Sequence, residues 1–316
     1  MKIALVHNPS AGGGRHSGDE LWGLLRSHGY DPVAIPPEDD LAEAVTSKRV
    51  AFAVVAGGDG TIRRNALVLA PTGVPMAPLP MGTANNIGRS LGIGGTVEEI
   101  IASWSVDRPR AVDLGVATGP WGRRCFLEGC GLGLVGRSIS VIEEIDEATH
   151  REFSDPEDKL HRDLSVFIAL VEEFVPFRTS IALDAWRSDD DFLLIEVMNI
   201  QHAGPRIQLT RCADPADGLL DIVLAADADR ERLRHSLKTS LAGRVPDPIL
   251  DSRRSREVRV AFAGADFRID DEVVLPRSQE PLSRKQVDVT LTVLPGALRL
   301  IVPRGAHGCS DGASDR

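Results

Sequence analysis

The stretch that decides the fold is VAFAVVAGGDGT, residues 50–61. Its first half, Val50–Val55, is apolar throughout, which is typical of a strand in a parallel sheet that is covered on both faces. The glycine-rich loop Gly57–Thr61 follows at once, and Ile62–Ala70 has the pattern of a helix. A strand, a loop and a helix in this order indicate an open α/β sheet.

The same order recurs on both sides of this stretch. Strands are predicted at 3–6, 33–35 and 76–79, and helices at 21–28, 40–47 and 97–104. The loop Asn8–Gly14 follows the first strand, and Gly82–Asn86 follows the strand at 76–79. In an open α/β sheet, loops at the carboxyl ends of strands bind ligands. We therefore expect three loops at one sheet edge to form a nucleotide-phosphate site.

Asp59 lies inside the most specific of these loops. A carboxylate would repel a phosphate directly, so two roles make chemical sense. It holds Mg²⁺ through water, or it accepts the proton of an attacking hydroxyl. The structural alternative is a cap on a tight strand-to-helix turn.

The second half of the chain is rich in strands. Helices are predicted at 139–150, 160–174 and 229–241. Closely spaced strands with turn signals predict an antiparallel sandwich. These strands are expected at 111–117, 125–127, 179–184, 192–199, 219–225, 258–262, 267–269, 287–293 and 298–302.

Two acidic clusters lie among these strands. Asp214, Asp217 and Asp221 occur in DPADGLLD, which reads either as a turn or as a divalent-metal site. Asp270-Asp271-Glu272 follows the strand at 267–269. It reads either as exposed hairpin charge or as the source of a base or metal ligand, Glu272 or Asp270.

GLGLVG, residues 131–136, matches the GxGxxG pattern of dinucleotide-binding sites. That pattern requires an early βαβ unit with an acidic residue after a second strand, about twenty residues on. The region there is the charged stretch Ser154–Lys159. The glycines are therefore predicted to allow close backbone packing rather than to bind NAD.

Composition excludes several classes of function. The chain has 316 residues and a formal net charge of -10, which argues against nucleic-acid binding. No run is long enough for a transmembrane helix. The four cysteines have no metal-ligand spacing and read as reduced thiols of a cytoplasmic protein. A lipid partner would be met from the aqueous side, in a transient contact with the membrane surface.

Five motifs in order, NPSAGGG, VAGGDGT, PLPMGTANNIGRSLGI, DPADGLLD and IDDE, resemble the bacterial diacylglycerol kinase-like lipid kinases. The resemblance runs from Met1 to Pro303. It implies a three-layer α/β nucleotide-binding domain of the NAD kinase and phosphofructokinase type, followed by a β-sandwich domain. It also implies an ATP-dependent enzyme that transfers the γ-phosphate of Mg-ATP to the hydroxyl of a diacylglycerol-like lipid.

The resemblance also implies boundaries and site residues. The catalytic domain would cover 1–118, with about 296–303 returning to it, and the lipid domain 119–295. The Gly-, Ser- and Asp-rich composition of 304–316 separately predicts a disordered tail. A cleft between the two would hold Mg-ATP and the acceptor. Asp59 and Glu272 would be the catalytic acids, and Asp217, Asp214 and the Leu219 carbonyl a structural Mg²⁺ site. The nucleotide would contact Asn8, Pro9, Ser10, Gly12, Gly13, Gly14, Gly57, Gly58, Gly60, Thr61, Thr83 and Asn85.

Three positions depart from the family pattern. Arg64 stands where the family usually has Glu, Asn86 where it has Asp, and Asp271 where the DGE turn has Gly. These departures keep open a nucleotide- or lipid-binding homologue without catalysis. The acidic charge and the lack of an obvious membrane-binding helix keep open a kinase of a soluble acceptor such as NAD or a sugar phosphate. The sequence leaves the acceptor and the oligomeric state open, with a homodimer as one option.

Overall fold

The computed structural model describes residues 1–14, 16–36, 39–150, 153, 155–211, 213–244, 250, 252–275 and 286–304. The chain divides into two compact units. Unit 1 comprises Met1–Asp113 and the chain from Pro295 onward, and unit 2 comprises Leu114–Leu294. The break lies at 113 rather than the predicted 118, and the return at 295 rather than 296. Of the predicted tail, only Arg304 lies among the described residues.

Unit 1 contains a parallel sheet in the order β2-β1-β3-β4, and the end of β17 continues it beside β4. Residues of β3 and β4 are almost entirely buried, as expected for central parallel strands. The strands are β1 (Lys2–His7), β2 (Asp31–Ala34), β3 (Ala53–Gly57), β4 (Met76–Pro80) and β17 (Val287–Leu300).

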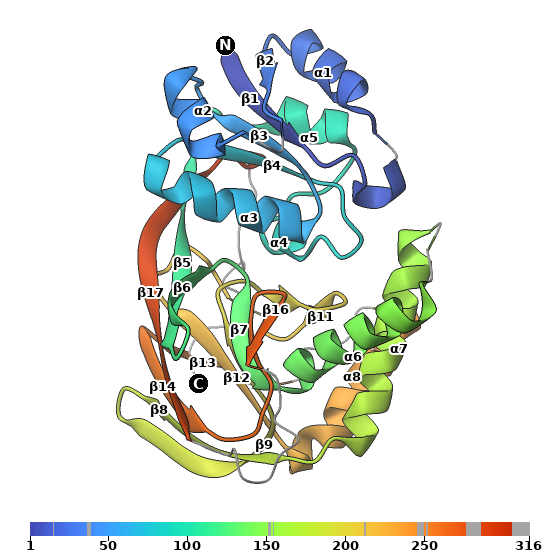
Figure 1. The fold of residues 1–316 in the computed structure, drawn as a ribbon, viewed down its shortest axis with the longest axis vertical. Coiled ribbons are helices and arrows are strands. Elements are labelled where there is room, and N and C mark those ends of the chain that lie inside the picture. Colours follow the sequence, from blue (N-terminus) through green and yellow to red (C-terminus); the bar gives the residue numbers. More distant parts are fainter. Residues whose placement is uncertain are drawn as a thin grey trace. The chain divides into compact units, whose positions relative to one another are not determined.

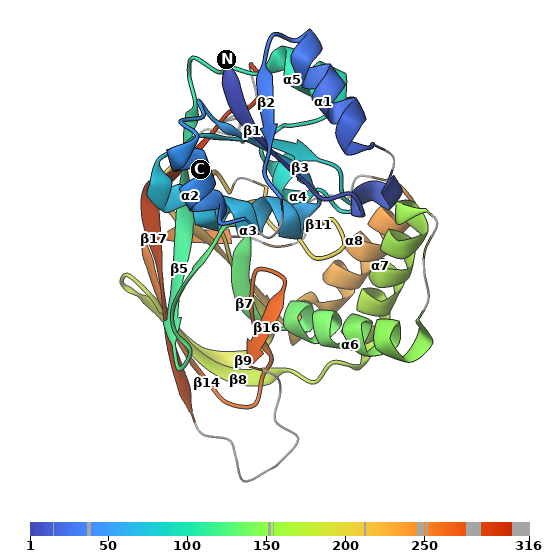
Figure 2. The same cartoon turned by 45° about the horizontal axis from the view of Figure 1, so that its top comes forward.

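Helices lie on both sides of this sheet, α1 and α5 on one and α2 and α3 on the other (Figures 1 and 2). Local chemistry sets their first residues. Ser17 and Glu20 form a capping box at α1, and Thr96 and Glu99 form another at α5. The helices are α1 (Gly18–Ser27), α2 (Leu41–Ser47), α3 (Asp59–Leu69), α4 (Asn86–Ser90) and α5 (Val97–Ser103), with 3₁₀ turns η1 (Ala11–Gly14) and η2 (Ala70–Thr72).

Unit 2 is built on antiparallel strands, in the order β16-β15-β7-β9-β8-β14-β17; β12 and β13 extend from β9, and β5 and β6 join at β17. The strands are β5 (Arg110–Gly119), which begins in unit 1, β6 (Gly122–Phe126), β7 (Gly129–Gly133), β8 (Phe177–Leu183), β9 (Trp186–Met198), β12 (Leu220–Ala226), β13 (Ser252–Ser255), β14 (Glu257–Phe262), β15 (Phe267–Ile269) and β16 (Glu272–Leu275), with a small ribbon of β10 (His202–Ala203) and β11 (Ile207–Gln208).

Two apolar cores organise unit 2. One lies between the strands and includes Phe126, Phe267 and Val260. The other lies between the sheet and three helices, where Phe167 of α7 and Leu233 of α8 are fully buried. Those helices are α6 (Leu134–Thr149), α7 (Pro156–Glu173) and α8 (Arg230–Leu241), preceded by the turn η3 (Asp227–Asp229). No helix in the described part of the chain combines the length and the hydropathy needed to cross a bilayer.

The predicted fold class, an α/β domain followed by a β-sandwich, is confirmed. Some details differ from the prediction, among them β13 and β16, which the sequence pattern does not predict as strands. The strands predicted at 287–293 and 298–302 form one long strand, β17, which passes through Pro295 and Gly296 without a break and ends at Leu300. Helix α6 begins at Leu134 rather than 139, and the glycine-rich segment before it is a strand, β7.

Candidate active-site residues in the two units

The three loops predicted to share one sheet edge do meet in unit 1. The amide Nδ2 of Asn8 donates to Oγ1 of Thr61 over 3.0 Å, which joins the first loop to the second. The backbone N–H of Met81 donates to the carbonyl of Gly57 over 2.8 Å, which joins the second to the third. Hydrogen bonds therefore join the loops of three β-loop-α units.

Glycines allow the loops to approach this closely. A Cβ on Gly12 would lie 2.4 Å from the Met81 carbonyl oxygen, and one on Gly82 would lie 2.6 Å from Cα of Gly58. Neither contact is sterically possible, so backbone must pass against backbone at both points. Gly12 and Gly13 also have φ of 61° and 72°, the left-handed region that favours glycine.

The first loop contains a local turn on Asn8. Its Oδ1 accepts from the N–H of Ser10 over 3.1 Å and from the Ser10 hydroxyl over 2.8 Å. This is an Asx turn, and it directs the amide end of Asn8 to Thr61. Pro9, Ser10, Gly13 and Gly14 are exposed beside it.

Asp59 occupies the first turn of α3, and its Oδ1 accepts from the backbone N–H of Ile87 over 3.0 Å. In the third loop, Oδ1 of Asn85 accepts from the N–H of Gly82 over 2.7 Å. Asn85 itself has φ of 52°, which asparagine tolerates better than most residues. Both side chains hold the third loop, and Asp59 ties it to the second.

The start of α3 has the features of an anion site. Its N-cap is Gly58, which has no side chain to accept from the first-turn amides. Those amides and the helix dipole favour a negatively charged ligand, and Gly60 and Thr61 lie in the same turn. Of the residues that depart from the family pattern, Arg64 is exposed on α3 and Asn86 is 4% exposed at the start of α4.

The predicted metal residues form a compact turn in unit 2. Oδ1 of Asp214 accepts from the N–H of Ala216 over 3.2 Å, and Oδ1 of Asp217 accepts from that of Leu219 over 2.9 Å. Arg254 lies 3.5 Å from Oδ2 of Asp217. Within the described residues, no group of three or more His, Cys, Asp or Glu side chains is arranged to hold a metal. The predicted ligands are the carboxylates of Asp214 and Asp217 and the carbonyl of Leu219, which are oxygen ligands of the kind that Mg²⁺ prefers.

Glu272 begins β16 and forms a bidentate ion pair. Arg124 of β6 donates from Nη1 to Oε1 over 3.1 Å and from Nη2 to Oε2 over 2.6 Å. The pair is partly exposed, and its hydrogen bonds raise the pKa of Arg124 above its ordinary value. Glu272 therefore has a defined side-chain position within unit 2.

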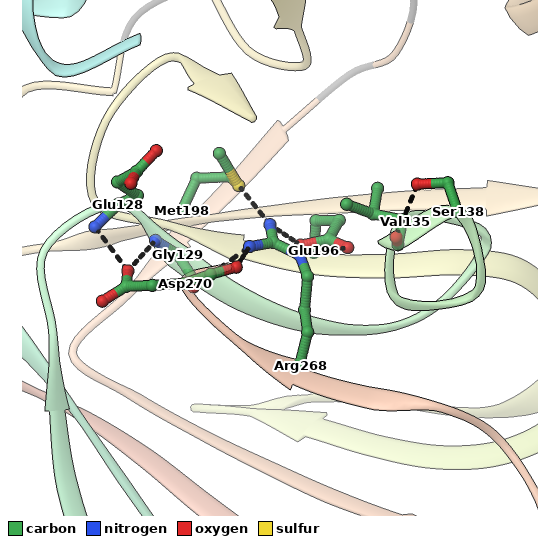
Figure 3. Close-up of polar contacts among 8 residues, drawn as sticks. All are labelled: Glu128, Gly129, Val135, Ser138, Glu196, Met198, Arg268 and Asp270. Atoms are coloured by element: carbon green, nitrogen blue, oxygen red, sulfur yellow. Dashed lines mark hydrogen bonds and ion pairs between the residues drawn. The ribbon is translucent and has the colours of Figure 1, made fainter. Parts of the chain in front are cut away.

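Asp270, the other predicted candidate in this turn, is 3% exposed and serves the backbone. Its carboxylate accepts from the N–H groups of Leu127, Glu128 and Gly129 at 3.3, 2.8 and 3.2 Å. Figure 3 shows the bonds from Glu128 and Gly129. A carboxylate that accepts three amides is held in place by the backbone segment that donates them.

Sequence reasoning missed the residues around this turn. Arg268 and Glu196 are fully buried and paired, and Arg268 also contacts the carbonyl of Asp270 (Figure 3). One signal could have found them. Glu196 is a charged residue in the apolar run 192–199, and a buried charge requires a partner.

The prediction of close packing at the GxGxxG segment is confirmed. A Cβ on Gly131 would lie 2.3 Å from the Ile195 carbonyl oxygen, and one on Gly133 would lie 2.4 Å from that of Leu193. The segment joins a strand to a helix, but β7 pairs antiparallel with β9 and β15, whereas dinucleotide sites need parallel strands. Of the four cysteines, Cys125 and Cys130 are free thiols, while Cys212 and Cys309 lie outside the described residues.

Comparisons with known proteins cover both units. Residues 2–117 match the family model of the diacylglycerol kinase catalytic domain, and residues 151–302 match that of the YegS C-terminal NAD kinase beta sandwich-like domain. A diacylglycerol kinase of Mycobacterium tuberculosis is 26% identical over 97% of this chain and 96% of its own length. A protein of Pseudomonas syringae pv. tomato named "Probable lipid kinase YegS-like" is 30% identical over 79% of this chain and 75% of its own.

Solved structures show the same fold. A putative diacylglycerol kinase of Bacillus anthracis superposes with a TM-score of 0.67 at 20% identity, covering 97% of this chain and 98% of that one. A second structure, also of a putative diacylglycerol kinase from that organism, gives a TM-score of 0.65 at 21% identity, covering 95% and 97%. Fold, motif order and relatives agree, and the chain belongs to the diacylglycerol kinase-like family of bacterial lipid kinases.

Proposed function

We propose that this kinase-family protein transfers the γ-phosphate of Mg-ATP to the hydroxyl of a diacylglycerol-like lipid. The proposal rests chiefly on one observation. Three β-loop-α loops are joined by hydrogen bonds around the start of α3, where the N-cap Gly58 makes no side-chain capping bond. The names of the relatives, diacylglycerol kinase and YegS-like lipid kinase, support the same choice of reaction. The acceptor would be met from the cytoplasmic side, in a transient contact with the membrane surface.

The nucleotide is assigned to the three loops of unit 1. Crossing glycines leave backbone N–H groups accessible to an anion, and the start of α3 supplies the favourable dipole. Thr83 and Asn85 are assigned to the adenosine side. The phosphates and ribose are assigned to Asn8, Pro9, Ser10, Gly12, Gly13, Gly14, Gly57, Gly58, Gly60 and Thr61.

Two acids are assigned to the acceptor hydroxyl. Asp59 offers a carboxylate whose position is fixed by the N–H of Ile87, so it can orient the hydroxyl or take its proton. Glu272 is the second candidate base and is held by Arg124. Mg²⁺ bound with the nucleotide supplies neutralisation of charge on the transferred phosphoryl group. Most of the rate enhancement is expected from positioning.

A separate structural Mg²⁺ is assigned to the turn at Asp214 and Asp217. The carbonyl of Leu219 would be its third protein ligand. Arg254 already neutralises part of the charge on Asp217, so the ion would share this carboxylate with a guanidinium. Its role would be to fix the turn that leads into β12.

The direct test is transfer of label from γ-labelled ATP, with Mg²⁺, into an extracted lipid mixture. NAD and sugar phosphates are offered in parallel reactions. We expect label in lipid for the wild type and at least about a hundredfold less for Asp59→Asn. The asparagine keeps an oxygen that can accept from Ile87 N–H, so the variant removes the charge and leaves the loops joined.

Asp19→Asn, on the first turn of α1, is the matched control and should react at the wild-type rate. Label in NAD or a sugar phosphate alone would replace the lipid assignment by a soluble acceptor. ATP binding without transfer to any acceptor would identify a non-catalytic homologue. An Asp59→Asn variant of undiminished rate would refute the role of Asp59.

A further inference from the structure

An ion pair lies at the centre of unit 2, where charges are costly. Arg268 of β15 is 2% exposed and Glu196 of β9 is not exposed at all. Nε of Arg268 donates to Oε1 of Glu196 over 3.2 Å, and Nη2 donates to Oε2, so the contact is bidentate (Figure 3). Such geometry is the strongest that a guanidinium and a carboxylate can form.

Stability is a weak reason for a protein to have such a pair. Burial raises the pKa of the Glu196 carboxyl, and Arg268 counteracts that effect. Replacing both partners of a buried pair by apolar residues of similar volume often leaves stability unchanged or higher. The pair is therefore expected to serve a geometric purpose.

The contacts of the third guanidinium nitrogen of Arg268, Nη1, indicate that purpose. Nη1 donates to the carbonyl of Asp270 over 2.5 Å and lies 3.4 Å from the carbonyl of Gly129. One rigid fork thus contacts β9, the first residue of β7 and the turn that precedes β16. Lysine could not make these contacts together, because its donors share one point charge.

The same turn is held from its other side. Asp270 has φ of 54°, a strained value for aspartate, and its carboxylate accepts the amides of residues 127–129. Its own N–H donates to the Gly129 carbonyl over 2.8 Å. Asn199 donates from Nδ2 to the carbonyl of Leu127 over 2.9 Å. The turn and the 127–129 segment form one hydrogen-bonded unit.

Both ends of the Glu272–Arg124 pair are attached to this unit. Glu272 lies two residues after Asp270 and pairs with Ile269 across β15 and β16. Arg124 lies on β6, which ends at Phe126 immediately before the 127–129 segment. A shift of the turn would therefore move Glu272 relative to its guanidinium partner.

We propose that Arg268, oriented by Glu196, is a positioning residue that fixes the Asp270–Glu272 turn and so places the Glu272 carboxylate. The inference rests on the proposed catalytic role of Glu272. It assigns no contact with substrate to Arg268. A purely structural role would affect stability, whereas a positioning role affects turnover at constant stability.

The test uses the double variant Arg268→Met/Glu196→Leu, which removes the pair without leaving an unpaired buried charge. We expect a melting temperature at or above that of the wild type, kcat at least tenfold lower and KM for ATP within about twofold of wild type. Amide exchange at residues 127–129 should speed up at least tenfold, because Asp270 no longer holds them. Val260→Ala, in the same apolar core, controls for general loosening and should lower stability without lowering kcat.

A second measurement links the effect to Glu272. Glu272→Gln should lower kcat strongly in the wild type and by less than about twofold in the double variant, because the two changes remove the same function. A full additional loss in the double variant, or a double variant with wild-type kcat and amide exchange, would overturn the proposal. Arg268→Lys, which keeps the charge but not the fork, should reproduce the loss in kcat if the double variant does not fold.

The proposed function and this inference fail differently. A Glu272→Gln variant as active as the wild type would refute the catalytic role of Glu272. Positioning of Glu272 by Arg268 would then have no effect on turnover. Amide exchange at 127–129 then still decides whether Arg268 holds the turn. Glu272→Gln inactivation combined with a fully active double variant rejects the positioning role alone.

Discussion

At the scale of single residues, Thr61 joins two of the three loops by a side-chain hydrogen bond. Its hydroxyl accepts from Nδ2 of Asn8 and is the side-chain link between the first and second loops. Asn8 uses its other amide atom, Oδ1, on Ser10, so the first loop depends on both ends of one side chain. Thr61 therefore contributes to the shape of the site, whether or not it contacts a phosphate.

The variant Thr61→Val has nearly the same volume and lacks the acceptor oxygen. Loss of one hydrogen bond of this kind costs about 1 kcal/mol, so KM for ATP should rise about fivefold. Steady-state kinetics with ATP varied at saturating acceptor measures this, and circular dichroism checks the fold. Thr61→Ser keeps the hydroxyl and should keep KM near the wild-type value; an equal rise in both variants would argue that the methyl group, not the hydroxyl, matters.

The sequence could predict which loops meet but not how their side chains are used. Glycines and strand order suffice to bring Gly57–Thr61 and Gly82–Asn86 to one sheet edge. Nothing in the pattern shows that Oδ1 of Asp59 accepts from Ile87, because that bond depends on the third loop's path. The same holds for Asp270, whose carboxylate is turned inward onto three amides rather than outward as a hairpin charge.

At the scale of elements, β7 shows how close packing against a neighbouring strand sets the composition of a strand. Every second residue of β7 is glycine, at 129, 131 and 133. The middle one faces Glu196 directly, since a Cβ there would lie 2.5 Å from the Glu196 carboxylate. In the GxGxxG pattern, Gly131 and Gly133 thus pack against β9, while Gly136 packs against Asp266, so the pattern arises from close packing.

Gly131→Ala should consequently be severely destabilising. Its Cβ would also meet the Ile195 carbonyl oxygen at 2.3 Å, and backbone in the middle of a sheet cannot move aside. We expect a loss of about 3 kcal/mol or more in the free energy of unfolding, measured by urea denaturation.

Gly23→Ala is the matched control, because Gly23 lies within α1 and a Cβ there would meet nothing within 4 Å. That variant should be neutral or stabilised by about 0.5–1 kcal/mol, the gain in helix propensity. Equal stability of the two variants would mean that β7 packs less tightly than described.

At the scale of the whole molecule, β17 belongs to both units, as β5 does. β17 begins at Val287 in unit 2, where it pairs with β14, and its last residue, Leu300, pairs with Met76 of β4 in unit 1. Gly296 donates its N–H to the buried carboxylate of Asp113 over 2.7 Å within unit 1. The family resemblance implied this return, but the apolar pattern alone suggested two separate strands, since Pro295 and Gly296 resemble a turn.

The core of unit 1 therefore depends on residues that arrive more than two hundred positions after β4. Leu298, Leu300, Ile301 and Val302 are almost completely buried there. Leu300→Ala should lower the free energy of unfolding by about 2–5 kcal/mol, because a fully buried leucine leaves a cavity that the sheet cannot close. Amide exchange resolved by peptide should locate the loss in β1, β3 and β4, and the affinity for ATP should fall with it.

Arg299→Ala, at the exposed position just before Leu300, is the control and should leave the free energy of unfolding within about 0.5 kcal/mol of the wild type. Faster exchange confined to β8, β9 and β14 would show instead that the end of β17 stabilises unit 2.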